Sequence, residues 1–278
     1  MIVGLIGGCS STRLLYDNAP WLVRGQIDDY FSITSKQEQQ LDRDIELFFE
    51  WHRHRELPEY ANVISNFKRQ FADGLTRDEL TQVFDQLVAA RIRFTEASLP
   101  SASQFLASIN NTQLENFDRE FRQKIAEDRE RSELPIEQRM QENYDRLLDS
   151  LEDWFGDLDE KQQQDLRLIS DARPDNYAQW LDYRERRHQS LVALLREKPE
   201  AAAIKTYLHN QYVKTLQQDS NHLRNTSRRY WMSAILRIDQ IFTPAQRQRA
   251  MRKLDDYRQD FIHLSEQKDA EKRIEVVR

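Results

Sequence analysis

The chain has few of the residues that tight turns and disulfide bonds require. It contains six glycines in 278 residues, and after Gly25 only Gly74 and Gly156 remain. A β-rich fold needs many turns with positive φ angles, which glycine supplies. The only cysteine is Cys9, so no disulfide can form within one chain. We therefore expect an all-α fold.

Long apolar segments are missing as well. Hydrophobic residues make up 39% of the chain and charged residues 32%, and the formal net charge is -6. No apolar run reaches the length of about 18 residues that spans a bilayer, so the sequence predicts no transmembrane helix. With so many charged side chains we expect a thin core and an elongated or open helical body. The mild net charge excludes little.

Helical signals run through the rest of the chain. The strongest apolar stripe at helical spacing consists of Tyr144, Leu147, Leu148, Leu151, Trp154 and Phe155. A capping residue is followed three positions later by Gln or Glu, the pattern of a capping box, at Thr34, Thr76, Thr112, Asp159 and Thr243. Together these signals predict roughly eight to ten amphipathic helices in an elongated or open helical-hairpin bundle.

Three prolines share one context, because each follows a leucine: Pro58, Pro100 and Pro135. Proline is tolerated in the first turn of a helix, where its missing N–H has no partner to lose. We therefore expect each of the three to open a helix.

The stretch Leu5–Ser10 (LIGGCS) resembles a bacterial lipobox, in which Cys9 would be acylated after cleavage behind a small residue. A lipoprotein signal should begin with basic residues and 7–15 apolar ones, but only eight residues precede Cys9 and none is basic. We interpret this as a start codon placed too late. By resemblance to Gram-negative lipoproteins, Ser10 after the cysteine favours the outer membrane. The alternative is a cytosolic protein with an incidental cysteine.

This interpretation divides the chain into three parts. Residues 1–8 look like a truncated signal remnant, and residues 9–32 a lipid-anchored tether with a first helix. No Gly/Ser-rich linker interrupts residues 33–278. We expect these residues to form one helical domain, or two lobes that meet near Pro135.

Two resemblances add to this interpretation. The chain resembles an uncharacterised family of helical lipoproteins of Gram-negative bacteria through Gly8–Ser11, Leu14–Tyr16, Asn18–Trp21, Lys36–Gln40, Trp51 and Leu57–Tyr60. Phe242–Arg247 and Ile33–Gln37 are similar to the LTxxQ motif of the Spy and CpxP type of periplasmic chaperones. That similarity implies a helical protein that binds unfolded clients without a cofactor, but T-x-x-Q is also an ordinary helix start.

No sequence pattern predicts a catalytic or metal site. His52 and His54 lie two residues apart and point in different directions on a helix, so they are poor joint metal ligands. The chain has no G-x-S-x-G, H-E-x-x-H or C-x-x-C spacing. We expect neither an enzyme nor a metal or other cofactor.

Charge segregation offers a candidate binding surface. Eight basic residues lie between His222 and Lys253, opposed only by Asp239: Arg224, Arg228, Arg229, Arg237, Arg247, Arg249, Arg252 and Lys253. Residues 137–160 are instead strongly acidic. Either the two segments compensate each other, or the basic one faces an anionic partner.

The sequence thus predicts a lipid-anchored protein on the periplasmic face of the outer membrane, which acts by binding as a scaffold or chaperone-like module. Its partners would be the membrane through Cys9 and a protein client, anionic lipid or lipopolysaccharide, with no nucleic acid. One alternative is a cell-wall or lipid-processing factor. Another, if the lipobox is false, is a cytosolic nucleic-acid binder whose basic segment binds polyanions.

Overall fold

The computed structural model describes residues 9–218 and 221–267, with side chains from residue 12 onward. These residues form α-helices and two π-helical segments and contain no strand, so the predicted all-α fold is confirmed. The first half comprises α1 (Cys9–Phe31), α2 (Ser35–Trp51), η1 (His52–Glu56), α3 (Leu57–Phe71), α4 (Arg77–Ser108) and α5 (Asn111–Ser132). The second half comprises α6 (Ile136–Phe155), α7 (Glu160–Asp171), α8 (Tyr177–Arg196), α9 (Ala201–Leu208), η2 (His209–Lys214), α10 (Thr215–Gln217), α11 (His222–Ile241) and α12 (Pro244–Glu266).

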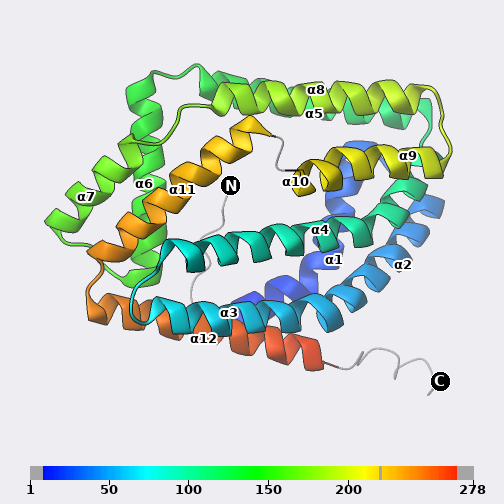
Figure 1. Ribbon diagram of the computed structural model, residues 1–278. Helices are drawn as coiled ribbons and strands as arrows, with labels where there is room; N and C mark the ends of the chain where they lie inside the picture. The colour runs from blue at the N-terminus through cyan, green and yellow to red at the C-terminus, as the bar shows by residue number, and fades with distance from the viewer. Residues whose placement is uncertain (1–8, 219–220, 268–278) are drawn as a thin grey trace.

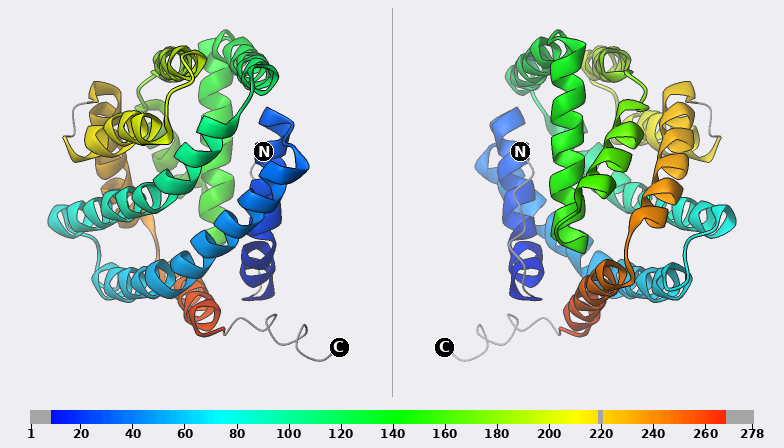
Figure 2. Two further views of the ribbon diagram at one scale, coloured as in Figure 1. Left: turned by 90° about the vertical axis from the view of Figure 1, so that its right-hand side faces the viewer. Right: turned by 90° about the vertical axis from the view of Figure 1, so that its left-hand side faces the viewer.

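The helices are arranged as an open frame of antiparallel or crossing pairs (Figure 1). Helices α5 and α8 run along one side, α3 and α12 along the opposite side, and α6, α7 and α11 join them at one end. Helix α4 packs against α9, while α1 packs against α2, α5 and α12. Seen from either end, α1 and α2 form one edge of the molecule (Figure 2).

Two separate clusters make up part of the buried core. The first joins α4, α5, α8, α9 and η2 through Leu99, Leu114, Leu191, Val192, Leu195, Ile204, Leu208 and Val213. The second joins the α6–α7 loop, α7 and α11 through Leu158, Leu166, Ile169, Ala234 and Ile238, and the apolar stripe of α6 packs against it. The two clusters draw on interleaved segments of the chain. The suggestion of two lobes that meet near Pro135 stays a prediction.

Four of the five predicted capping boxes are confirmed. Both hydrogen bonds of the box form at Thr34, Thr76, Asp159 and Thr243. The prediction for Thr112 is wrong, because Asn110 is the capping residue and Gln113 is its reciprocal partner. Asparagine caps helices as well as threonine does, and the box starting at Asn110 satisfies the same orphan N–H groups two residues earlier.

The three leucine–proline pairs behave differently from one another. Pro135 is the N-cap of α6, as predicted. Pro58 lies in the first turn of α3, but that helix continues directly from η1, so no new helix direction starts there. The prediction for Pro100 is wrong, because it lies inside α4. Its neighbours Leu99 and Ser103 are 4% and 2% exposed, and their packing keeps the helix intact through the proline.

The two late glycines end helices or form turns. Gly156 is the C-cap of α6 with a φ of +84°, and Gly74 in the turn between α3 and α4 has a φ of +102°. These angles are costly for any other residue. Within the described residues, no helix combines the length and apolar character needed to cross a bilayer.

Candidate functional site

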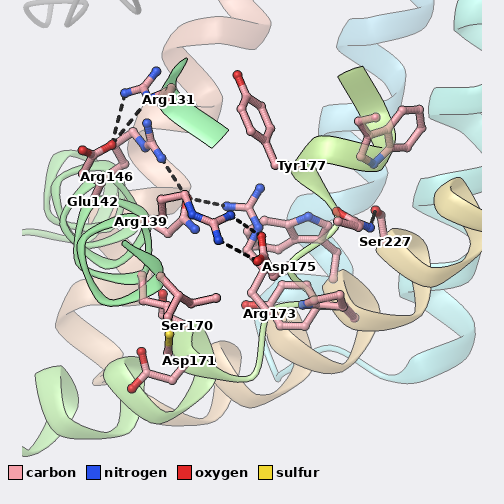
Figure 3. A pocket seen from close by; sticks show the side chains of 18 residues that line it. Arg131, Arg139, Glu142, Arg146, Ser170, Asp171, Arg173, Asp175, Tyr177 and Ser227 are labelled. Atoms are coloured by element: carbon pink, nitrogen blue, oxygen red, sulfur yellow. Dashed lines mark hydrogen bonds and ion pairs between the residues drawn. The ribbon is translucent and has the colours of Figure 1, made fainter. Parts of the chain in front are cut away.

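An arginine-lined cleft of about 310 Å³ opens between α6, the α7–α8 loop, the start of α8 and α11. Figure 3 shows the charged side chains around it. Four arginines line the cleft: Arg131, Arg139, Arg146 and Arg173. Its aromatic side chains are Tyr177, Trp180, Tyr230 and Trp231. This combination of guanidinium groups and rings suits a ligand that carries an anionic group next to an apolar or planar part.

Helix α6 aims its polar residues at the cleft because of its periodicity. Its stripe of Tyr144, Leu147, Leu148 and Leu151 packs on the second core cluster. Arg139, Asn143 and Arg146 are spaced by four and three residues, so they share the neighbouring face of the helix. The burial of the stripe therefore turns these three side chains to the cleft.

Arg173 reaches the same place from the α7–α8 loop. Its N–H donates to the Ser170 carbonyl at 3.0 Å, and Pro174 follows it directly. A following proline disfavours the helical conformation at Arg173. The loop therefore leaves the helix direction at Arg173, and the side chain extends to α6, where it contacts Asn143.

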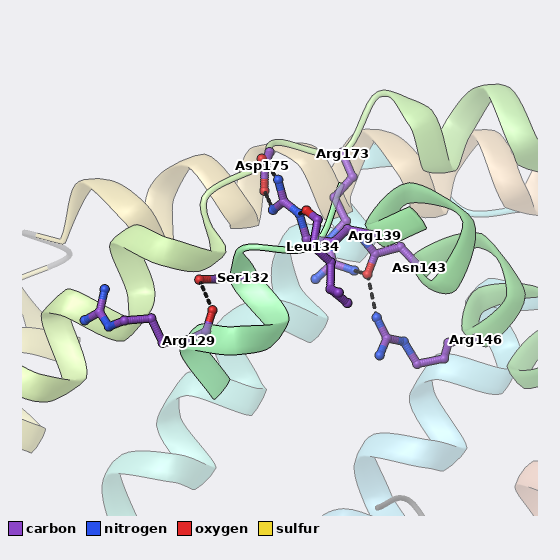
Figure 4. A network of polar contacts seen from close by, with 8 residues as sticks. All are labelled: Arg129, Ser132, Leu134, Arg139, Asn143, Arg146, Arg173 and Asp175. Atoms are coloured by element: carbon purple, nitrogen blue, oxygen red, sulfur yellow. Dashed lines mark hydrogen bonds and ion pairs between the residues drawn. The ribbon is translucent and has the colours of Figure 1, made fainter. Parts of the chain in front are cut away.

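Arg146 and Arg173 converge on one neutral oxygen. Asn143 Oδ1 accepts from Arg146 Nη2 at 2.7 Å and from Arg173 Nη1 at 3.2 Å (Figure 4). Among the described residues, neither guanidinium forms an ion pair with a carboxylate. Two positive charges that share one acceptor repel each other, and at a separation of about 4 Å the repulsion in water is roughly 1 kcal/mol. An anion bound between them would remove this repulsion and accept charge-assisted hydrogen bonds from both.

Arg139 holds the walls of the cleft together. Its guanidinium binds both oxygens of Asp175, at 2.5 and 2.8 Å, and its Nε donates to the Leu134 carbonyl at 3.1 Å. The side chain of Arg139 is 19% exposed. Arg139 therefore links the α5–α6 turn to the α7–α8 loop, and its positive charge is already neutralised by Asp175.

The aromatic wall is held by a hydrogen bond and by ring contacts. Tyr230 OH donates to the Ile169 carbonyl at 3.0 Å, and Trp231 packs edge-on against Tyr230. The guanidinium of Arg173 lies 5.7 Å from the centre of the Trp231 ring. Burial raises the pKa of Tyr230 and, with the charge of Asp128 as the next cause, the pKa of Tyr177. Both phenols stay neutral, and no histidine or cysteine is among the described residues that line the cleft. The arrangement places cationic groups beside an aromatic wall, which suits the binding of an anion.

The basic residues predicted as an anionic-partner surface are divided between two helices. Arg224, Arg228, Arg229 and Arg237 lie on α11, whereas Arg247, Arg249, Arg252 and Lys253 lie on α12. Three of them form ion pairs within the fold: Arg228 with Asp85 at 2.7 Å, Arg247 with Asp239 at 2.5 Å and Lys253 with Asp153 at 2.5 Å. Arg224 donates to the Thr215 carbonyl. The exposed members of the set are Arg229, Arg237, Arg249 and Arg252.

The predicted lipidation site is described only in part. Cys9 is the first residue of α1, but its side chain and residues 1–8 lie outside the described part of the chain. Lipidation therefore stays a prediction.

The segment Trp51–Arg55, which contains two histidines, lies at the end of α2 and in η1. Its histidines contact polar groups of α1 and α12. His52 Nδ1 shares a hydrogen bond with Tyr16 OH at 2.9 Å, whereas His54 Nδ1 contacts the Ser265 carbonyl at 3.1 Å. Burial lowers the pKa of His52 and raises the pKa of Tyr16 to about 12. Across the described residues, no group of three or more His, Cys, Asp or Glu side chains is placed to hold a metal.

One residue of η1 was missed altogether. Glu56 is 2% exposed and binds Arg93 of α4 through both carboxylate oxygens, at 2.7 and 2.8 Å. The cleft was also missed, because Arg139 and Arg146 stand out in the sequence only as two bases within an acidic segment. Their spacing of seven residues, with Asn143 between them, was the available signal.

The comparison with protein families found a match. A family model described as a family of unknown function, DUF6279, matches residues 29–220, which is more than half of the chain. No curated protein matches, and no solved structure matches. The predicted resemblance to an uncharacterised family is confirmed at this level, while the likeness to Gram-negative lipoproteins and to Spy and CpxP gains no support. The chain belongs to the DUF6279 family of unknown function.

Proposed function

We propose that this protein is a lipid-anchored protein on the periplasmic face of a Gram-negative outer membrane, and that it acts by binding an anionic partner rather than by catalysis. The convergence of Arg146 and Arg173 on Asn143 carries the binding part of this proposal. The lipobox-like stretch that ends in Cys9 and Ser10 carries the location. The partner presents a phosphate or carboxylate group, as phospholipids, lipopolysaccharide and acidic proteins do.

The lining residues of the cleft favour a scaffold or chaperone-like role over a lipid- or wall-processing one. Processing a covalent bond needs a positioned acid, base or nucleophile. The carboxylates at the cleft instead pair with arginines, since Asp175 binds Arg139, Glu142 lies 3.4 Å from Arg131 and Asp171 lies 3.4 Å from Arg167. The exposed guanidinium groups of Arg146 and Arg173 remain available to a partner.

Removing the two convergent arginines is expected to weaken anion binding. We expect inorganic pyrophosphate to bind the wild-type chain and to bind Arg146→Ala/Arg173→Ala about tenfold or more weakly, because two charge-assisted hydrogen-bond donors are lost. Isothermal titration calorimetry measures both affinities. Binding should also weaken with added salt, since both side chains are exposed.

The matched control removes two exposed arginines of α12. Arg249→Ala/Arg252→Ala deletes the same charge from the predicted basic surface and should leave pyrophosphate binding unchanged. If this pair weakens binding and the cleft pair does not, the anionic partner belongs to the basic surface and the cleft assignment is wrong.

The lipid anchor is tested at Cys9. Expressed with its upstream region in a Gram-negative host, the wild-type chain should incorporate labelled palmitate and fractionate with the outer membrane, and Cys9→Ala should lose both. An acyl chain contributes about 0.8 kcal/mol for each buried CH₂, so the change in fractionation should be nearly complete. An unlabelled wild-type chain in the cytosol would contradict the proposed location.

A further inference from the structure

Helix α1 presents an uncharged apolar face to the outside of the molecule. At 100° per residue one side of the helix collects Leu14, Leu15, Asn18, Trp21, Leu22 and Gly25. The exposed fractions are 66% for Leu14, 63% for Trp21 and 45% for Leu22. At Gly25 an added Cβ would meet no atom within 4 Å. These residues form a continuous surface, which we call the α1 outer face.

The opposite side of α1 fixes the orientation of this face. Arg13 Nε binds Asp260 of α12 at 2.6 Å, and Arg24 Nη1 binds Glu38 of α2 at 2.8 Å. Asp260 is 1% exposed, so the first of these contacts anchors α1 deeply in the body. Both arginines therefore point toward neighbouring helices and away from the outer face, which can leave water without desolvating them.

We propose that the α1 outer face lies on a lipid surface, at the boundary between headgroups and acyl chains. This inference rests on the proposed anchor at Cys9. Because α1 begins at Cys9, the helix leaves no flexible segment between the anchor and the body. Leu14 lies about 8 Å along the helix axis from Cys9, at 1.5 Å per residue. Acyl chains inserted at Cys9 therefore hold the first turns of α1 at the membrane surface.

The composition of the face fits this boundary. Amphipathic helices in the interface bury leucines about 5–10 Å deep, and tryptophan is enriched at that level. Asp17 and Asp28 border the face and Asp29 lies at its end, and all three are exposed. These carboxylates favour zwitterionic over anionic headgroups. The α1 outer face thus favours a lipid surface without net charge. Its contact with lipid does not involve the arginine cleft.

The test uses Cys9 as a chemical handle, because it is the only cysteine. The unacylated full chain is coupled through Cys9 to a maleimide lipid in vesicles of phosphatidylcholine and phosphatidylethanolamine, which imposes the anchor whether or not cells add one. Brominated phosphatidylcholine quenches a tryptophan that reaches the boundary. We expect a loss of emission in brominated vesicles that is absent from Trp21→Phe and from Leu14→Glu/Leu22→Glu.

The matched control is Leu87→Glu/Leu168→Glu. Leu87 lies on α4 and Leu168 on α7, and they are 56% and 64% exposed, so this variant adds the same two carboxylates away from α1 and should keep the quenching. Equal emission of the wild-type chain in brominated and plain vesicles would overturn the inference. So would a dimer in solution that Leu14→Glu/Leu22→Glu dissociates, with Trp21 shielded from the brominated lipid.

The two proposals fail in different ways. Palmitate label at Cys9 without quenching of Trp21 would retain the anchor and reject the lipid-bound face. Quenching of the coupled chain without palmitate label in cells would reject the anchor and retain the lipid affinity of the face.

Discussion

Arg247→Ala is expected to lower the free energy of unfolding by about 3 kcal/mol or more, because it leaves a buried carboxylate without its cation. Asp239 is 6% exposed, and Arg247 Nη1 lies 2.5 Å from its Oδ1. The same guanidinium donates to the carbonyls of Phe71 and Asp239, at 2.8 and 2.9 Å, and lies 4.5 Å from the centre of the Phe71 ring. One side chain thus joins α3, α11 and α12. Urea unfolding followed by circular dichroism measures the loss.

Arg249 supplies the control for this prediction. It lies two residues further along α12, is exposed, and belongs to the same predicted basic surface. Arg249→Ala should change the unfolding free energy by less than about 0.5 kcal/mol. Equal effects of the two substitutions would mean that the Asp239 pair contributes no special stability. Within the predicted basic surface, Arg247 is therefore expected to stabilise the fold through its pair with Asp239.

The second large effect is expected at the buried glutamate of η1. Glu56 is 2% exposed, whereas its partner Arg93 keeps 44% of its side-chain surface. Arg93→Ala removes the cation that binds the buried Glu56 carboxylate and should lower the free energy of unfolding by about 2–3 kcal/mol. This loss is smaller than the one expected at Asp239, because water can enter the space that Arg93 occupied. Glu56→Gln leaves Arg93 free to turn to solvent and should cost only about 1 kcal/mol. Denaturant unfolding of both variants reveals the asymmetry.

Arg91 is the matched control for Arg93. It lies one half-turn earlier on α4 and is exposed, so Arg91→Ala removes the same charge and helix former without touching Glu56. Its unfolding midpoint should stay within experimental error of the wild type. If Glu56→Gln costs as much as Arg93→Ala, the glutamate stabilises the fold through contacts other than this ion pair.

Local hydrogen bonds explain why the helix starts were predictable. A capping box joins residues three positions apart, so Thr34, Thr76, Asp159 and Thr243 could be identified without knowledge of any neighbour in space. The error at Thr112 arose because Asn110 offers the same chemistry two residues earlier. The error at Pro100 has a different source, since the packing of α4 against α9 overrides a local signal.

Long-range pairing explains what could not be predicted. The cleft brings Arg173 of a loop to Arg146 of α6, and nothing near Arg173 in sequence indicates its partner. The same holds for Glu56, whose buried carboxylate binds Arg93 of another helix. A carboxylate in a charged segment has the same local sequence pattern whether it is solvated or buried.

The amino-acid sequence by itself determined the helical class, the absence of disulfides within the chain and most helix starts, because turn chemistry, cysteine number and caps depend on neighbours along the chain. The tertiary structure alone decided which charges are partnered, which arginines converge and which apolar residues stay outside. Arg247 and Arg249 have nearly the same local sequence, and Leu14 and Leu57 are the same residue type. Their roles differ because only packing determines whether a side chain meets a carboxylate, the core or the solvent.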